Sequence, residues 1–456
     1  MTRDALLALS KEDLVALVLA QQARIEALTA QVAALTAEVA ALQARLKVPP
    51  KTPDNSSTPP SQGEKPNHPD RPRKRRRGRA GVARALAEHP DHVIEATLAA
   101  CPHCAHPLGP AEPTSIHAYD HVELPPIRPI ITRVNRHHGT CPCCRQRIVA
   151  PVPAGLESGS PFGPGLRALI IHLHSTQAIG FERLARLLAE VFGVTISEGA
   201  IANMLARAAT PLLAAAAPIA AAVRTSAVVG SDETSARVGG QSWWQWVLLS
   251  STAIYHLIVP RRAASVVIDF LDGCQPEVWV ADRYAAQAGH GNVRQLCLAH
   301  LLRDAQYAID EGDTVFALGF RFLLLRAMAI GRRRPGLQDS TLRQYHGDLE
   351  RRLDRLLSQP PDTPAARRLF QAMRRDRGDL FRFVTRRDVP NTNNACERAL
   401  RPSVIFRKVT GCFRSQWGAE VYAAAASVIA TGRIYGLTAL QALRNALAGA
   451  PVMLQA

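Results

Sequence analysis

The chain has 456 residues, enough for two to four domains, and 47% of them are hydrophobic, so a sizeable core can form. Its 55 Lys and Arg against 38 Asp and Glu give a formal net charge of +17 at pH 7. This excess favours a polyanionic partner such as nucleic acid, and no lipid-anchor motif points to a membrane surface. Charged residues interrupt the first twenty positions, and the apolar run 212–223 is too short to cross a bilayer, so we expect a cytoplasmic protein.

Residues 1–48 are predicted to form a coiled-coil zipper, because two sets of positions each recur every seven residues and the steps between the sets alternate between four and three. The first set is Val18, Ile25, Val32, Val39 and Leu46, and the second is Leu14, Gln21, Leu28, Leu35 and Leu42. β-Branched residues in one set and Leu in the other favour a parallel two-stranded coil, hence a homodimer or a larger assembly. The alternative is a single amphipathic helix that packs on its own chain.

Residues 49–80 are predicted to be a disordered linker that carries a basic arm. The stretch 49–70 is rich in Pro, Ser, Asn and Asp, and the like charges that follow repel one another and have no apolar side chain to bury. We expect the arm to contact DNA phosphates without base preference. Its candidate residues are Arg71, Arg73, Lys74, Arg75, Arg76 and Arg77.

Residues 81–155 are predicted to form a zinc ribbon around two CxxC pairs, Cys101–Cys104 and Cys141–Cys144. Nine cysteines without an export signal favour metal binding over disulfides, and these four are the candidate Zn²⁺ ligands. Nearby Cys143, His103 and His106 leave the assignment open. Residues 120–134 alternate in strand fashion. Whether the ribbon binds DNA or only holds a small fold together is open.

Residues 156–222 are predicted to be helical. A periodic helix over 181–192 is followed by Gly193, and a second helix starts near Ser197. Helix, glycine-containing turn and helix is the pattern of a DNA-binding helix-turn-helix, although an ordinary helical hairpin has the same pattern.

Residues 223–414 are predicted to be an α/β domain, with a helical insertion at about 311–389 and a helical C-terminal element over 415–456. Two short apolar strands lead into Asp232 and Asp282, and 243–249 pairs with 254–259 as a hairpin. Helices are expected over 264–271 and 296–310. A later helix is expected to begin near Asn394, to carry Glu397 and to end before Pro402.

Three carboxylates on separate elements suit phosphoryl transfer on DNA, because two Mg²⁺ ions need hard oxygen ligands that converge in one crevice. Each acid also has an ordinary explanation. Asp232 and Asp282 could be turn formers or helix caps, and Glu397 could belong to a capping box with Asn394.

Four motifs resemble those of the IS66 family of insertion-sequence transposases. They are Asp232-Glu-Thr234, Asp282-Arg-Tyr284, Cys297-Leu-Ala-His300 and Asn393-Asn-Ala-Cys-Glu-Arg-Ala-Leu-Arg-Pro402, of which the last is the most specific. The order of zipper, ribbon, helix-turn-helix, catalytic domain and C-terminal helices also resembles that family over nearly the whole chain. One departure is Arg283, where the family usually has Gly after the second Asp.

The resemblance implies a DDE transposase that binds the ends of its element, cleaves phosphodiesters and joins 3′ ends to target DNA. It implies a ribonuclease-H-like catalytic domain, in which Asp232, Asp282 and Glu397 are the catalytic acids and hold Mg²⁺ or Mn²⁺. Residues expected to support that site are Cys297, His300, Asn393 and Asn394, and residues expected to contact DNA are Arg398, Arg401, Arg407 and Lys408. The implied setting is a bacterial nucleoid, with accessory transposition proteins as further partners. The alternative is a non-catalytic zinc-dependent DNA-binding protein, such as a repressor or a decayed transposase.

Overall fold

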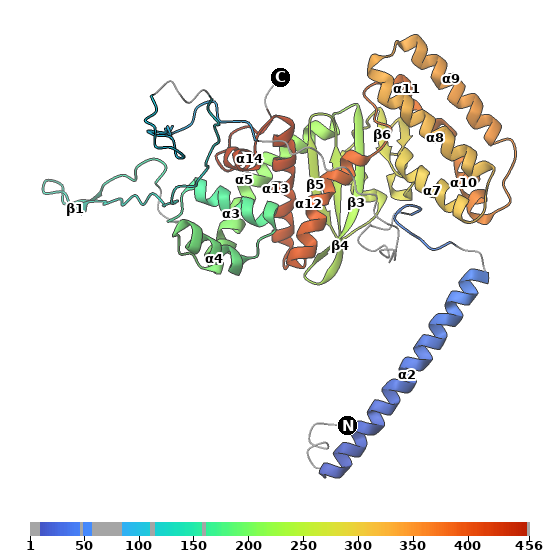
Figure 1. Ribbon diagram of the computed structural model, residues 1–456, viewed down its shortest axis with the longest axis horizontal. Coiled ribbons are helices and arrows are strands. Elements are labelled where there is room, and N and C mark those ends of the chain that lie inside the picture. The colour runs from blue at the N-terminus through green and yellow to red at the C-terminus, as the bar shows by residue number, and fades with distance from the viewer. Residues whose placement is uncertain (1–9, 46–48, 57–83, 110–114, 157–160, 454–456) are drawn as a thin grey trace. The chain divides into compact units, whose positions relative to one another are not determined.

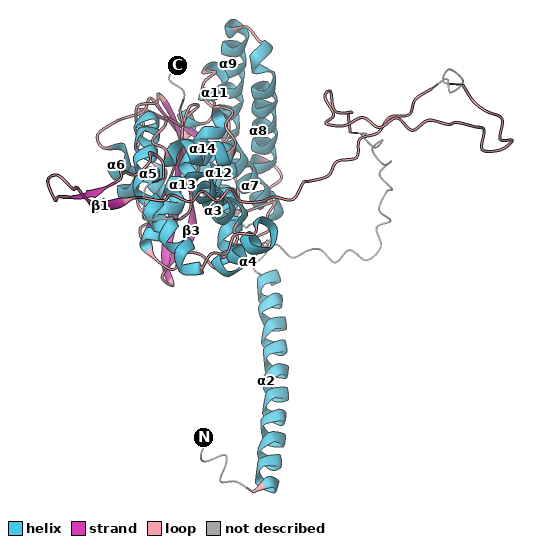
Figure 2. Ribbon diagram, turned by 90° about the vertical axis from the view of Figure 1, so that its left-hand side faces the viewer, coloured by secondary structure: helices cyan, strands magenta, loops and turns pink. Residues whose placement is uncertain are grey.

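The structure is a computed structural model that describes residues 10–45, 49–56, 84–109, 115–156 and 161–453. The predicted basic arm lies outside these residues. The chain divides into two compact units, one formed by 1–64, 134–186 and 196–456 and the other by 65–133 and 187–195. In the smaller unit, residues 84–109 and 115–133 contain no helix and no named strand (Figure 2).

The zipper region is one long helix, α2 (Lys11–Arg45). Its apolar seam faces solvent along the described length, with Val18, Ile25, Val32 and Leu35 each 60–62% exposed. The prediction of a helix is confirmed, whereas the coil itself stays a prediction.

The strand expected over 120–134 is absent, so that prediction was wrong. Alternation there has no buried face to support it, because side chains such as Val122, Leu124 and Ile130 are exposed. The strands form further on, as the antiparallel hairpin β1 (His138–Thr140) and β2 (Arg147–Val149) around the second CxxC pair.

Three helices lead to the sheet: α3 (Pro164–Gln177), α4 (Phe181–Phe192) and α5 (Glu198–Arg224). Gly193 adopts a left-handed φ of 63° after α4, and the Ser197 hydroxyl caps α5 by accepting from the Ala200 N–H at 3.2 Å. By length and composition α5 could cross a membrane. Its buried face instead packs against α13 (Gln416–Ile434) and β5 (Ile254–Val259), as a core helix does.

A five-stranded mixed sheet forms the centre of the larger unit, in the order β5-β4-β3-β6-β7. The strands not yet given are β3 (Val228–Val238), β4 (Gln241–Leu249), β6 (Val278–Ala281) and β7 (Val293–Leu296). Strand β4 pairs antiparallel with both β3 and β5. Strand β6 pairs in parallel with β3, and β7 pairs in parallel with β6. The crossover between β5 and β6 runs through α6 (Ala264–Leu271), where the sequence predicted a helix.

Helix α12 (Asn394–Thr410) runs alongside β3 and β4 (Figure 1). It does not end before Pro402, as expected, but continues for eight residues beyond it. An interior proline removes one helical hydrogen bond and costs about 3 kcal/mol. The second half of the helix offsets this cost, since Phe406 is buried there and the Ser403 hydroxyl accepts hydrogen bonds from Gln245 and Tyr422.

The region predicted as an insertion is helical and shares its core with the sheet. It consists of α8 (Phe316–Arg333), α9 (Asp339–Leu356), α10 (Pro364–Arg375) and α11 (Arg382–Thr385). The helix before it, α7 (Leu298–Asp310), forms where a helix over 296–310 was expected and packs against α8 and α10. Figure 2 shows α8 and α9 side by side. Val280 of β6 and Leu296 of β7 belong to the same apolar cluster as the bundle, so the bundle and the sheet edge support each other. After α13, the helix α14 (Ala439–Leu447) closes the chain.

A buried polar network joins strands β4 and β5 to helices α12 and α13. Gln245 Nε2 donates to Ser403 Oγ at 2.8 Å and lies 3.3 Å from His256 Nδ1, and the Tyr422 hydroxyl donates to the same Ser403 oxygen at 3.1 Å. The Ser427 hydroxyl accepts from the His256 backbone N–H. Because this network fills the gap between sheet and helices, His256 is fully buried and its burial lowers its pKa from 6.5 to about 4.

We predict that His256 makes the fold acid-sensitive. Between pH 6.5 and 4 the unfolded chain binds a proton at this residue and the folded chain does not, so stability falls as pH falls through that window. Denaturant titrations at pH 7 and pH 5 should differ by about 2 kcal/mol more in the wild type than in His256→Gln. A His346→Gln control on α9 should keep the wild-type difference, and an equal difference in all three proteins would contradict the assignment.

Candidate active site

The register of two parallel strands brings Asp232 and Asp282 to the same level of the sheet. Gly230 on β3 pairs with Val280 on β6, and each aspartate lies two residues further along its strand direction. Neighbouring strands are about 4.8 Å apart, so the two residues start from adjacent positions. Asp282 follows the end of β6, as expected. Asp232 lies inside β3, since this strand continues to Val238, and not at a strand end.

Asp232 is half-buried in a cluster of carboxylates. One of its oxygens, Oδ1, accepts from the Glu233 backbone N–H at 3.0 Å. Burial raises its pKa well above the usual range, and the negative charges of Glu233, Asp282 and Glu397 raise it further. Asp282 and Glu397 therefore both lie within electrostatic reach of Asp232, although the three acids are far apart in the chain.

Close packing of α12 on β3 positions Glu397. A Cβ atom on Gly230 would lie 3.1 Å from Cys396 Sγ, so a side chain at this strand position would push the helix away. The start of α12 is fixed as well, because Asn393 Nδ2 donates to the Ser231 carbonyl at 3.2 Å. Asn393 occupies the N-cap position but its side chain makes no capping bond, and Asn394 is the first helical residue. The capping-box explanation for Glu397 therefore does not hold.

Cys297 and His300, at the start of α7, contact the same site. Cys297 Sγ accepts from the Asn393 N–H at 3.3 Å, and the Cys297 N–H donates to the Ala281 carbonyl at 2.9 Å. The buried thiol thus ties the end of β6 to the start of α12, and its burial raises its pKa. One turn later, His300 Nε2 lies 3.8 Å from Glu397 Oε1.

Two arginines, Arg303 on α7 and Arg283 beside it, add positive charge to the same site. Arg303 Nη1 lies 3.9 Å from Glu397 Oε1, and Arg283 Nη2 bonds to Asp304 Oδ2 at 2.6 Å. Burial raises the pKa of Asp304, while Arg283 opposes the rise. Our sequence reasoning missed Arg303, although its spacing of three residues from His300 on one helix places both on the same face.

A further group that the sequence reasoning missed surrounds Glu233. Its carboxylate accepts from Arg262 Nε at 3.0 Å and Nη2 at 2.8 Å, and its second oxygen accepts from Gln287 Nε2 at 2.7 Å. The Arg262 guanidinium carbon lies 4.6 Å from the centre of the Trp244 ring and 4.1 Å from that of Tyr284. No spacing rule could have linked these residues, because they come from β3, β4, the loop after β5 and the segment after β6.

The donor set at this edge suits a hard divalent cation. Carboxylate oxygens are the ligands that Mg²⁺ prefers, and a clustered set of acids with a raised pKa at Asp232 is relieved by a cation. Buried polar atoms without a partner among the described residues also gather here, namely Asn393 Oδ1, Ser231 Oγ and His300 Nδ1. Within the described residues no group of three or more His, Cys, Asp or Glu is already arranged to hold a metal ion. The acids are near one another but not in the geometry of a formed three-ligand site.

The two CxxC pairs form the same turn. The Cys101 N–H donates to the His106 carbonyl and the Cys141 N–H to the Gln146 carbonyl, both at 2.8 Å. Backbone hydrogen bonds from His103 and Cys104 lower the pKa of Cys101, and those from Cys144 and Cys143 lower the pKa of Cys141. Such turns favour thiolates, the form that binds zinc. Since the described residues contain no group of three or more His, Cys, Asp or Glu placed to hold a metal ion, the zinc ribbon is not supported beyond these turns.

The predicted DNA-contacting residues of α12 differ in environment. Arg398 and Arg401 are exposed on the helix that carries Glu397. Arg407 instead bonds to the backbone carbonyl and hydroxyl of Ser235 on β3, so it also holds the helix to the sheet. Lys408 is exposed in the last turn of α12.

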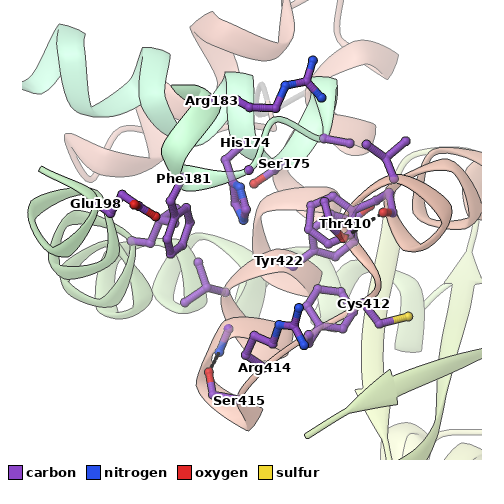
Figure 3. Close-up of a pocket in the computed structure, with 18 of the residues that line it drawn as sticks. His174, Ser175, Phe181, Arg183, Glu198, Thr410, Cys412, Arg414, Ser415 and Tyr422 are labelled. Carbon is purple, nitrogen blue, oxygen red and sulfur yellow. Dashed lines mark hydrogen bonds between the residues drawn. The ribbon is translucent and has the colours of Figure 1, made fainter. Parts of the chain in front are cut away.

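A separate cavity of about 510 Å³ lies between α3–α5 and α12–α13 (Figure 3). His174 packs against Phe181 and Phe406 in its wall, with ring centres 5.0 and 5.4 Å away. Arg183 and Arg414 line it as well. None of the predicted catalytic or supporting residues lines this cavity.

A mixed five-stranded sheet with acids grouped around β3 and the end of β6, in a chain of strongly basic composition, is consistent with a nucleic-acid-processing enzyme of the α/β class. The sequence model of the Transposase IS66 family matches residues 159–421, more than half of the chain. The protein therefore belongs to the IS66 family of transposases, as its motifs predicted. A search of curated proteins finds no match.

Proposed function

We propose that this transposase binds the ends of its element, cuts a phosphodiester there and joins the freed 3′ end to target DNA. The observation that supports this best is that Asp282 after β6 and Glu397 on α12 are both near enough for their charges to raise the pKa of Asp232 on β3. The strand order β5-β4-β3-β6-β7 is consistent with a ribonuclease-H-like domain. Family membership supports the class of reaction.

The three carboxylates would hold Mg²⁺ or Mn²⁺. Bound divalent ions activate the attacking oxygen and stabilise the leaving oxygen of an in-line displacement. Asp232 on β3 and Asp282 directly after β6 would supply two carboxylate ligands, and Glu397 on α12 would supply the third. Cys297 and Asn393 act indirectly, by fixing the start of α12 against β3 and β6.

Two displacements at phosphorus account for the reaction. In the first, a water oxygen bonds to the scissile phosphorus and the bond from phosphorus to the 3′ oxygen breaks. One water proton ends on the freed 3′ oxygen, which gives a 3′ hydroxyl and a 5′ phosphate. In the second, the oxygen of that hydroxyl bonds to a target phosphorus and displaces the target's 3′ oxygen, which takes up the proton that the attacking hydroxyl loses. The second step needs no external energy source, because one phosphodiester bond forms as another breaks.

An assay with duplex DNA carrying the element's terminal inverted repeat tests this function. With Mg²⁺ or Mn²⁺ present, purified protein should nick the repeat at its end and then form a joined product with a second duplex. Binding without cleavage would favour the non-catalytic alternative. Cleavage without joined product would indicate a plain nuclease.

Zinc and self-association are proposed as the means of holding the DNA. The basic arm, the helices α4 and α5 and the exposed Arg398 and Arg401 would contact the ends, and the α2 zipper would pair two subunits across them. Accessory proteins of the element would be further partners in this scheme. The support for zinc is the matching thiolate-favouring geometry of the two CxxC turns.

We predict that purified protein contains about one zinc ion per chain, bound by four thiolates. Cys101→Ser with Cys104→Ser should lower the zinc content and weaken binding to end DNA, as measured by metal analysis and by titration of labelled duplex. Cys274→Ser, at an exposed cysteine outside both turns, is the matched control and should retain both. Zinc-free wild-type protein that still binds the ends would exclude the ribbon.

A further inference from the structure

Arg262 stands at the rim of the candidate active site, held on three sides. Its partner Glu233 directly follows Asp232 in the chain. The Glu233 side chain is only 3% exposed, whereas the Arg262 side chain is 40% exposed. The Arg262 carbonyl accepts from the Tyr284 hydroxyl at 2.9 Å, and the Tyr284 N–H donates to Asp282 Oδ1 at 2.9 Å. One cation is therefore tied to both chain segments that carry the catalytic aspartates.

The bonding of the guanidinium leaves one edge for a ligand. Nε and Nη2 both donate to Glu233, and within the described residues we find no partner for Nη1. Trp244 and Tyr284 lie against the guanidinium, so its orientation is set before any ligand arrives. An oriented, partly exposed arginine is the group that proteins use to bind phosphate oxygens.

The position of Arg262 selects which phosphate it can bind. Side chains alternate between the two faces of a strand, so Glu233 and Asp232 leave β3 on opposite faces. Arg262, bound to Glu233, therefore lies outside the cluster of Asp232, Asp282 and Glu397. Tyr284 links the two, because its ring lies 4.1 Å from the Arg262 guanidinium carbon and its N–H donates to Asp282 Oδ1. Since a single residue makes this link, a phosphate held by Arg262 would lie near the one that those acids act on and be distinct from it.

We propose that Arg262 binds a DNA phosphate adjacent to the scissile one, with Glu233 as the positioning residue that orients it. The proposal rests on the proposed cleavage of element ends. It gives the buried Glu233 carboxylate a role besides charge neutralisation. It also explains why an arginine with a complete ion pair remains accessible at the edge of the sheet.

Single-turnover cleavage of the terminal-repeat duplex by the full chain tests the proposal. Arg262→Ala should cut about 10- to 100-fold more slowly than the wild type, because a charged hydrogen bond to phosphate is lost. Arg262→Lys, which keeps the charge but not the fork, should recover only part of this loss. Arg261→Ala is the matched control: within the described part of the chain the side chain of this neighbouring arginine forms only an exposed ion pair with Asp269, and its loss should leave cleavage unchanged.

A scan with methylphosphonates distinguishes phosphate binding from a structural role. One neutral methylphosphonate replaces each phosphate in turn on both sides of the cut. At one adjacent position the wild type should slow about 10- to 100-fold, while Arg262→Ala should slow no further. Glu233→Gln should weaken this dependence without moving it to another phosphate.

The outcomes distinguish a failure of the proposed function from a failure of the role assigned to Arg262. A wild type that does not cleave would overturn the proposed function and this inference together. Cleavage in which every methylphosphonate slows the wild type, Arg262→Ala and Arg262→Lys by equal factors would overturn the inference alone. Thermal unfolding of each variant identifies a loss of fold, and in that event Arg262→Lys carries the comparison.

Discussion

Replacing Asp232 or Asp282 by Asn, or Glu397 by Gln, is expected to lower the rate of end cleavage and joining by about 10³-fold or more. Each substitution keeps the shape of the side chain but removes an anionic oxygen, and the lost transition-state stabilisation amounts to several kcal/mol. Binding to the terminal repeat should change little, because the acids do not supply the positive charge that attracts phosphate. Cleavage is measured at saturating protein and binding by titration.

Asp269→Asn, on the exposed face of α6, is the matched control for the loss of one carboxylate and should retain full activity. Wild-type rates in any one of the three active-site variants would remove that residue from the site. If all three retained activity, the carboxylate cluster would not be the place where DNA is cut.

The same variants have an expected effect on stability. The pKa of Asp232 is raised in the folded protein, so its ionised form at pH 7 opposes folding. Asp232→Asn is therefore expected to unfold at the same temperature as the wild type or higher when divalent ions are absent. Added Mg²⁺ should raise the unfolding temperature of the wild type and not that of the variant. A clear fall for Asp232→Asn without metal would contradict the assigned repulsion.

Charging the seam of α2 is expected to have the second large effect. Leu28→Glu with Leu35→Glu should weaken self-association by more than about 10²-fold, since each buried Leu contributes about 1.5–3 kcal/mol and each Glu adds repulsion across the seam. Both leucines are at least half exposed on the single helix, so folding of the chain itself does not depend on them. Sedimentation over a range of protein concentrations measures the change.

The control for this experiment lies on the opposite face of the same helix. Ala23→Glu with Ala30→Glu adds the same charge at positions that point away from the predicted seam, so association should persist. Loss of pairing in both double variants would indicate a general charge effect. Pairing that survives in both would place the contact between subunits elsewhere. If the zipper pairs two ends, the seam variant should also lose joining while it still binds single ends.

Several elements were predictable because their signals are local. The helix 264–271, the strands 254–259 and 278–281 and the helix 181–192 appear where periodicity and composition placed them. Local rules failed where tertiary packing opposed them. Pro402 predicted a helix end, but burial of Ser403 and Phe406 carries α12 onward to Thr410. The alternation of 120–134 predicted a strand, but no partner surface makes one there.

The sequence by itself determined the family, the basic character of the chain and the identity of three candidate acids, since motif residues and charge can be read without coordinates. Only the tertiary structure decided how those acids meet. The parallel pairing of Gly230 with Val280 places Asp232 and Asp282 at the same height on neighbouring strands. The absence of a side chain at Gly230 lets α12 pack closely on β3, which brings Glu397 near these aspartates. It also decided the place of Arg262, whose partners Glu233, Trp244 and Tyr284 belong to different strands and loops. The physical reason is that contacts between residues far apart in the chain depend on strand register and helix packing, which no local pattern encodes.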